Sequence, residues 1–92
     1  METLDVEARV KQILTKRVGI PPEHIELDAK LVTDLGLDSV DLVELAIAAE
    51  REFRIEISDE QMKGLLTVVD VVDLMKRLID EQGGSYPENS AS

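Results

Sequence analysis

Apolar residues recur at helical spacing in three long segments of this 92-residue chain. Residues three, four and seven positions apart share one face of an α-helix, so each segment is predicted to be a helix with one buried face. In the first segment, Thr3 is the candidate N-cap and Gly19 is expected to end the helix. The apolar positions of this segment are Val6, Val10, Ile13, Leu14 and Val18.

The second segment begins at Asp38 and Ser39 and has a strong helical pattern. Its main apolar stripe consists of Leu42, Leu45, Ala46, Ala49 and Phe53. A second apolar set lies on a different side of the same helix, among acidic residues, and consists of Val40, Val43 and Ile47. Either the third helix, predicted below, or the loop covers this second side, or it is a partner surface with an apolar centre and an acidic rim. The pattern alone favours neither.

Two capping signals predict the remaining helices. Ser58 precedes Gln61 and Thr67 precedes Asp70, each pair at the spacing of a capping box. The first pair introduces a short helix that is interrupted at Gly64. The second introduces a last helix that ends before residues 83–84, with apolar positions at Val68, Val71, Val72, Met75, Leu78 and Ile79.

The segment between the first two predicted helices contains two adjacent prolines and no sustained period, so we expect a long loop there. Residues 54–57 alternate in polarity, but they are too few to indicate a sheet. The predicted fold class is therefore all-α. We expect a bundle of four helices, three longer ones and a short third one, with the long loop between the first and the second.

We expect one folded domain over residues 1–82 and a flexible tail over residues 83–92. Apolar residues make up 43% of the chain, which is enough for a compact core, and Phe53 is the only aromatic residue before Tyr86. Residues 83–92 are instead rich in Gly and Ser and have no apolar period.

The charge and the cysteine count restrict the function. A formal net charge of −10 repels nucleic acids and anionic lipids, and it favours partners with basic surfaces. Without cysteine the chain has no disulfide and no thiolate metal site, and the spacing of its acidic residues does not match a calcium loop, so no metal ligands are predicted. No apolar run approaches the ~18 residues of a membrane span, and residues 1–5 lack the basic start of a signal peptide. We expect a cytoplasmic protein without membrane insertion.

Ser39 lies at the predicted start of the second helix, where serine is a common N-cap. Asp38 can cap this helix instead, with Asp41 at the third helical position, and the Ser39 hydroxyl would then be free. A phosphate on that hydroxyl would lie near the positive end of the helix, partly opposed by the neighbouring aspartates. A catalytic serine needs an adjacent base, and the only histidine, His24, belongs to the proline-rich turn. No catalytic residue is predicted, and we do not expect an enzyme.

The run Asp34-Leu35-Gly36-Leu37-Asp38-Ser39-Val40 resembles the phosphopantetheine attachment motif of the acyl carrier proteins, D-L-G-x-D-S-L/V. Other segments resemble the family in order and spacing, so that the resemblance covers residues 5–81. These segments are Val18-Gly19-Ile20, Ile25, Leu31, Val43-Glu44-Leu45, Glu52-Phe53, Ile57-Ser58-Asp59-Glu60 and Thr67-Val68.

This resemblance implies an acyl-carrier-like bundle whose Ser39, within the Asp38-Ser39 motif, receives 4′-phosphopantetheine from coenzyme A. A separate phosphopantetheinyl transferase performs the transfer, and the group supplies the thiol that the cysteine-free chain lacks. Members of the family often hold an acyl chain among their helices. We expect such a chain to insert among Val43, Leu45, Ala46 and the valines of the last helix.

The resemblance also implies partners for the second helix, namely the transferase and acyl-transferring, synthase or acyl-ligase enzymes with basic docking patches. The residues placed on this partner side are Val40, Asp41, Glu44, Ile47 and Glu50, with Asp38 beside them. Arg51 and Arg54 stand where many fatty-acid-synthesis members carry acidic residues, which indicates a specialised carrier.

The function implied is that of a monomeric carrier of acyl thioesters in fatty acid, specialised lipid or polyketide biosynthesis. Two alternatives stay open at this point. One is a peptidyl or aminoacyl carrier. The other is a small acidic helical interaction protein without a prosthetic group, in which Ser39 is only a helix cap.

Overall fold

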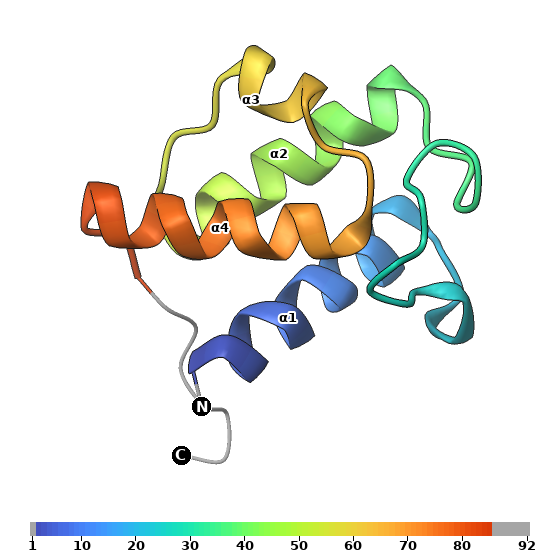
Figure 1. Ribbon diagram of the computed structural model, residues 1–92, viewed down its shortest axis with the longest axis horizontal. Helices are drawn as coiled ribbons and strands as arrows, with labels where there is room; N and C mark the ends of the chain where they lie inside the picture. The colour runs from blue at the N-terminus through green and yellow to red at the C-terminus, as the bar shows by residue number, and fades with distance from the viewer. Residues whose placement is uncertain (1, 86–92) are drawn as a thin grey trace.

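The computed structural model describes residues 2–85, and only the backbone of residues 2–5 (Figure 1). Its four α-helices are α1 (Glu2–Ile13), α2 (Ser39–Phe53), α3 (Asp59–Lys63) and α4 (Val68–Gln82). A π-helical segment, η1 (Leu14–Val18), continues α1, and a short 3-10 helix, η2 (Pro22–His24), lies in the following loop. No strand occurs among the described residues, where Lys30 and Thr67 form an isolated β-bridge. The predicted all-α bundle with a short third helix is confirmed.

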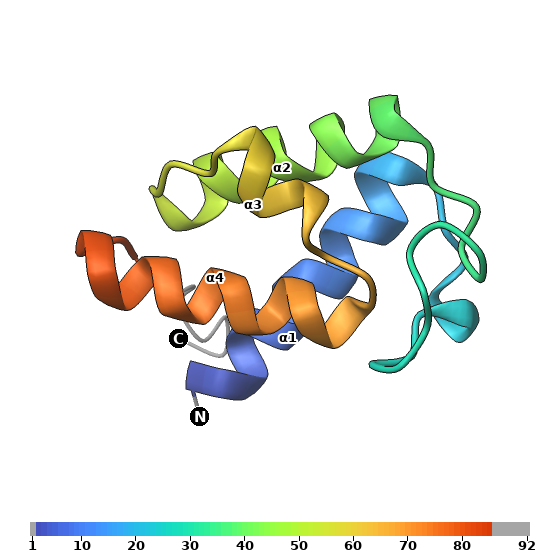
Figure 2. The same ribbon diagram turned by 45° about the horizontal axis from the view of Figure 1, so that its top comes forward.

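The three long helices α1, α2 and α4 all contact one another, and α2 also contacts η1. In both ribbon views α3 lies beside α2 and away from α1 (Figure 2). One side of α2 therefore faces the other long helices, and another side lies next to α3.

Local capping explains where the helices begin and end. Asp38, Ser58 and Thr67 are the N-caps of α2, α3 and α4, each in a capping box with the residue three positions later. Gly19 ends η1 at φ 92°, a left-handed conformation that glycine adopts without strain. The prediction for Thr3 was wrong, because α1 begins at Glu2 and Thr3 lies inside the helix.

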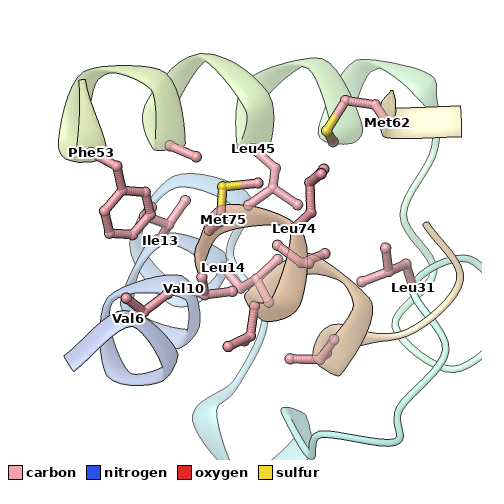
Figure 3. Close-up of a cluster of buried hydrophobic side chains, with 14 of the residues drawn as sticks. Val6, Val10, Ile13, Leu14, Leu31, Leu45, Phe53, Met62, Leu74 and Met75 are labelled. Carbon is pink, nitrogen blue, oxygen red and sulfur yellow. The ribbon is translucent and has the colours of Figure 1, made fainter. Parts of the chain in front are cut away.

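The core is aliphatic apart from one ring (Figure 3). Leu45, Ala49 and Phe53 of α2 are fully buried, as the apolar stripe predicted, while Leu42 and Ala46 are half-buried beside them. Side chains of α1, α2 and α4 converge on Leu45 and Met75, with Met62 of α3 at the edge of the cluster. No polar side chain is buried among the described residues, so the bundle is held together by apolar packing.

The long loop is fixed to the bundle at several points. Its side chains Ile25, Ala29, Leu31 and Leu37 are buried. Its backbone also bonds the junction between α3 and α4, since the Leu31 N–H donates to the Leu66 carbonyl at 2.8 Å. These contacts hold the loop in place up to Asp38, the residue that starts α2.

The end of α4 is also attached to α2. The Ser85 N–H donates to the Phe53 carbonyl at 2.7 Å, and the Gly84 N–H donates to the Ile79 carbonyl at 3.0 Å. A Cβ at Gly84 would lie 2.5 Å from the Phe53 carbonyl oxygen, so only glycine fits there. Residues 83–85, which we assigned to the flexible tail, thus pack on the end of α2, and residues 86–92 lie outside the described part. None of the described helices is long and apolar enough to cross a membrane.

Candidate functional site

The start of α2 is built so that Asp38, and not Ser39, caps the helix. The Asp38 Oδ1 accepts the Asp41 N–H at 2.9 Å, and the Asp41 Oδ2 accepts the Asp38 N–H at 3.2 Å. Ser39 is therefore the first helical residue. Its side chain is exposed, and its hydroxyl has no hydrogen-bond partner among the described residues.

The loop before Asp38 contributes to this geometry. Gly36 has a φ of 73°, which lets the chain turn back on itself, and the Leu37 N–H donates to the Leu31 carbonyl at 3.0 Å. The buried Leu37 side chain then anchors the residue next to the cap. Asp38 and Ser39 follow a fixed point in the core, which orients the serine outward.

The position fits a covalently attached phosphate. The hydroxyl is accessible, it is not used by the fold, and it stands at the N-terminus of a helix of 15 residues, where backbone N–H groups carry a partial positive charge. Asp38 and Asp41 lower this positive potential. Among the described residues no base contacts the hydroxyl, and His24 lies exposed in η2.

The second apolar side of α2 is not covered. Val40, Val43 and Ile47 are 67%, 53% and 46% exposed. Glu44 is exposed on the same helix and makes no hydrogen bond or ion pair with the described residues. Neither α3 nor the long loop buries these side chains, which removes one of the two alternatives left open by the sequence.

A groove of about 320 Å³ runs from Ser39 along α2. Its α2 wall uses positions 39, 42, 43, 46, 47 and 50, which share one face of the helix, and its other wall is made by Ile57 and α3. The lining is mostly apolar, and polar side chains stand at its rim. The lining residues are Ser39, Leu42, Val43, Ala46, Ile47, Glu50, Ile57, Asp59, Met62 and Lys63.

The groove differs from the cargo site that we expected. Val43 and Ala46 line it, but Leu45 is fully buried on the core side of α2. Val68, Val71 and Val72 of α4 are also buried and Val69 is half-buried, and none of these valines lines the groove. The apolar hollow next to Ser39 therefore lies between α2 and α3, and not between α2 and α4.

Glu50 differs from the other acidic residues placed on the partner side of α2. It lines the groove and is half-buried, and its Oε2 accepts the Ile57 N–H at 2.8 Å. Its carboxylate is thus bound to the protein's own backbone. Arg54, on the next turn, is the C-cap of α2 in a left-handed conformation, with a φ of 56°.

The wall made by Ile57, Asp59, Met62 and Lys63 was not predicted. The capping box at Ser58 indicated a short helix there, but no local signal places that helix beside α2. Among the described residues, no group of three or more His, Cys, Asp or Glu side chains is arranged to hold a metal ion.

Comparison with known families gives the class of protein. The family model described as the phosphopantetheine attachment site matches residues 8–75, more than half of the chain. The matched region includes Ser39, α2 and both walls of the groove. Domains of this family carry 4′-phosphopantetheine covalently, and they are carriers that are not themselves catalytic. The chain belongs to the phosphopantetheine attachment family, the family of the acyl carrier proteins.

Proposed function

We propose that this protein is an acyl carrier that holds acyl groups as thioesters on a 4′-phosphopantetheine group attached to Ser39. The observation that carries the proposal is the free, exposed Ser39 hydroxyl at the first position of α2, next to a cap supplied by Asp38. The attached group supplies the thiol that a chain without cysteine lacks. The transferase supplies the activation of the hydroxyl, which explains why no base is needed beside Ser39.

The residues around Ser39 have structural roles in this function. Asp38 and Asp41 fix the first turn of α2 through their reciprocal hydrogen bonds, so that Ser39 points away from the helix. The N–H groups of that turn favour the negative phosphate ester. Leu37, buried in the core, keeps this turn at a constant position relative to the bundle.

The groove supports an acyl cargo. Leu42, Ala46 and Met62 form an apolar surface that begins at Ser39 and follows α2. Each methylene of an acyl chain that leaves water on this surface contributes up to ~0.8 kcal/mol, less the cost of ordering the chain. A chain of medium length gains enough contact to lie along the groove, whereas an acetyl group has too little apolar surface to gain much from it.

The exposed side of α2 supports docking of enzymes. Val40 and Ile47 supply an apolar centre, and Asp41 and Glu44 supply negative charge around it. Basic patches on a phosphopantetheinyl transferase or on an acyl-handling enzyme are complementary to this surface. Exposed ion pairs contribute ~0–1 kcal/mol each, which suits brief contacts with a succession of enzymes.

The choice of pathway rests on the charges at the far end of α2. Arg51 and Arg54 are both exposed, so negative charge is concentrated in the first half of the helix. We propose that the protein serves a particular synthase or acyl ligase of fatty acid, specialised lipid or polyketide biosynthesis, whose basic patch faces Asp41 and Glu44.

The attachment site is tested by intact mass after incubation with coenzyme A and a phosphopantetheinyl transferase of broad specificity. Wild-type protein is expected to gain the mass of one phosphopantetheine group, and Ser39→Ala to gain none. Ser85→Ala, which removes an exposed serine outside the motif, is the control and should be modified fully. Modification of Ser39→Ala would overturn the assignment, and no modification of any form would favour an interaction protein without a prosthetic group.

The docking surface is tested by reversing one charge. Glu44→Lys is preferable to a change at Asp41, because Asp41 belongs to the cap of α2 and its loss also costs helix stability. The variant should slow modification at low salt, and the effect should shrink as salt rises. Glu23→Lys, the same charge change on the exposed η2, is the control. Equal rates for both variants would place the docking surface elsewhere.

A further inference from the structure

The wall of the groove opposite α2 is held at its ends and not along its length. It consists of residues 57–65, which include α3, and we call this segment the flap. Met62 is its only buried side chain, and Ile57 and Leu65 are half-buried. A segment with so little buried surface can open locally at low cost while the rest of the bundle stays folded.

Both ends of the flap are anchored to the bundle. Before the flap, the Glu56 N–H donates to the Gln82 Oε1 at 2.8 Å, and the Gln82 Nε2 donates to the Glu56 carbonyl at 2.9 Å. After the flap, the Leu66 N–H donates to the Asp70 carboxylate at 3.0 Å, and its carbonyl accepts the Leu31 N–H at 2.8 Å. These two anchors are fixed points between which the flap can move.

Within the flap itself, a single hydrogen bond reaches the rest of the described protein. This bond joins the Ile57 N–H to the Glu50 carboxylate at 2.8 Å. The other polar contacts of the flap are internal, such as the capping box between Ser58 and Gln61. The Glu50 side chain is therefore the one polar link between α2 and the opposite wall of the groove in the described part of the chain.

Glu50 is well placed to link α2 to the opposite wall of the groove. Its backbone carbonyl accepts the N–H groups of Arg54 and Ile55, which close the end of α2, and its carboxylate accepts the N–H of Ile57. It is half-buried and lines the groove eleven positions, or about 16 Å along the helix, beyond Ser39. A hydrogen bond to an ionised carboxylate is stronger than a neutral one, and more so where water is partly excluded.

We propose that Glu50 is a latch that holds the flap against α2 and so sets how far the groove opens to an acyl chain carried on Ser39. The role in cargo shelter rests on the function proposed above, whereas the latch itself does not. With the bond formed, Ile57 and Met62 close over Leu42 and Ala46. With the bond broken, the flap can swing between its two anchors, and the core side of α2, with Leu45 and Phe53, keeps its packing. Glu50 is a positioning residue in this proposal, because it acts through Ile57.

The latch is tested first by amide hydrogen exchange of the full-length protein as purified. Glu50→Ala should make the Ile57 amide exchange about tenfold faster or more, because a bond to a charged acceptor is lost. Glu50→Gln keeps an acceptor oxygen and should show a smaller increase. Glu44→Ala removes a carboxylate of the same helix that has no partner among the described residues, and it should leave the exchange rate of the Ile57 amide unchanged. An unchanged Ile57 rate in Glu50→Ala, or an equal increase in Glu44→Ala, would overturn the proposal.

The effect on cargo is tested with octanoyl and acetyl forms of the holo protein. The measured quantity is the rate at which hydroxylamine cleaves the thioester. In the wild type, the octanoyl form should be cleaved more slowly than the acetyl form. In Glu50→Ala, the acetyl rate divided by the octanoyl rate should fall toward the value measured for free acetyl-pantetheine and octanoyl-pantetheine. A merely destabilised bundle would change both rates together. Faster Ile57 exchange with an unchanged ratio would overturn the link between latch and cargo. Failure to load either acyl group would overturn the proposed function, and the exchange experiment would still decide on the latch.

Discussion

The two sides of α2 are both apolar in sequence, yet they differ in how they are covered. On the core side, Leu45, Ala49 and Phe53 are fully buried against α1, η1 and α4. On the groove side, Val43 and Ile47 remain 53% and 46% exposed, next to a flap joined to α2 by one hydrogen bond. The apolar character of a helix face does not decide whether it is buried. What decides it is whether the facing element has an apolar stripe of its own.

The facing elements differ in this respect. Helix α4 has 15 residues, and seven of them are buried. Helix α3 has five residues and buries only Met62. Most of the buried apolar surface, and with it the stability, is therefore expected on the core side, and the proposed flap lets the groove side change its shape without loss of the fold. A carrier needs this division, because cargo and partners change while the attachment site must stay in place.

The comparison is tested most strongly by one truncation on each side of α2. Phe53→Ala should lower the free energy of unfolding by about 3–5 kcal/mol, because it leaves a large cavity in a fully buried position. Ile47→Ala, on the groove side, should cost less than about 1 kcal/mol. Denaturant unfolding followed by circular dichroism measures both. Similar losses for the two variants would contradict the division of α2 into a core side and a groove side.

The two buried methionines sharpen the comparison with matched chemistry. Met75 of α4 is 0% exposed, and Met62 of α3 is 7% exposed. Met75→Ala should cost toward the upper end of about 2–5 kcal/mol, and Met62→Ala near its lower end, because the flap can relax into the space left behind. A larger loss for Met62→Ala, measured by chemical denaturation, would show that the flap is part of the core.

The features predicted correctly from the sequence are those that depend on neighbouring residues. A capping box involves residues three positions apart, so the caps at Ser58 and Thr67 follow from residue types alone. At the start of α2 the residue types left two candidates, Asp38 and Ser39, and the structure shows that Asp38 is the cap. The buried stripe of α2 follows from its period for the same reason. A residue type that suits a cap can also lie inside a helix. Thr3 does so, since α1 already begins at Glu2, and the prediction for Thr3 was therefore wrong.

The features that were missed depend on the meeting of distant segments. The capping box at Ser58 predicts a helix but does not place it beside α2. A position of the third helix over this side of α2 was therefore one of two open alternatives, and a groove between the two helices was not predicted. The Glu50 carboxylate was expected to face partners. Its bond to the Ile57 N–H depends on the path of the chain after α2, which the sequence pattern does not specify. Gly84 was taken for a flexible link, whereas the close approach of the Phe53 carbonyl is what requires glycine there.

The anchor after the flap, where the Leu66 N–H donates to the Asp70 carboxylate, gives a prediction that depends on pH. Hydrogen bonds from the Leu66 and Thr67 N–H groups hold the pKa of Asp70 below its ordinary value of 3.8, so the folded state favours the carboxylate. This contribution is fully present above the ordinary pKa and is lost as the pH falls through the lower, folded-state value. Asp70→Asn should therefore lower stability at neutral pH by less than about 1 kcal/mol, because solvent screens this carboxylate, and the difference from the wild type should shrink below about pH 4. Asp73→Asn, an exposed neighbour on α4, is the control for thermal melts over this range. A difference that does not change with pH would contradict the role of the charge.

The smallest expected effect concerns the end of α4, where residues 83–85 extend the core side of α2. Truncation after Gln82 removes the bond from the Ser85 N–H to the Phe53 carbonyl and the left-handed cap at Gly83, and should cost about 1 kcal/mol. Truncation after Ser85 keeps both and should leave the melting temperature unchanged. Gly84→Ala should resemble the truncation after Gln82, because a Cβ 2.5 Å from the Phe53 carbonyl oxygen forces the segment away from α2. If all three forms have the melting temperature of the wild type, these contacts contribute nothing to stability and the folded unit ends at Gln82. If only Gly84→Ala is destabilised, the contacts of residues 83–85 contribute nothing to stability. The added Cβ then strains α2 itself, because the core side of this helix cannot move away from the clash.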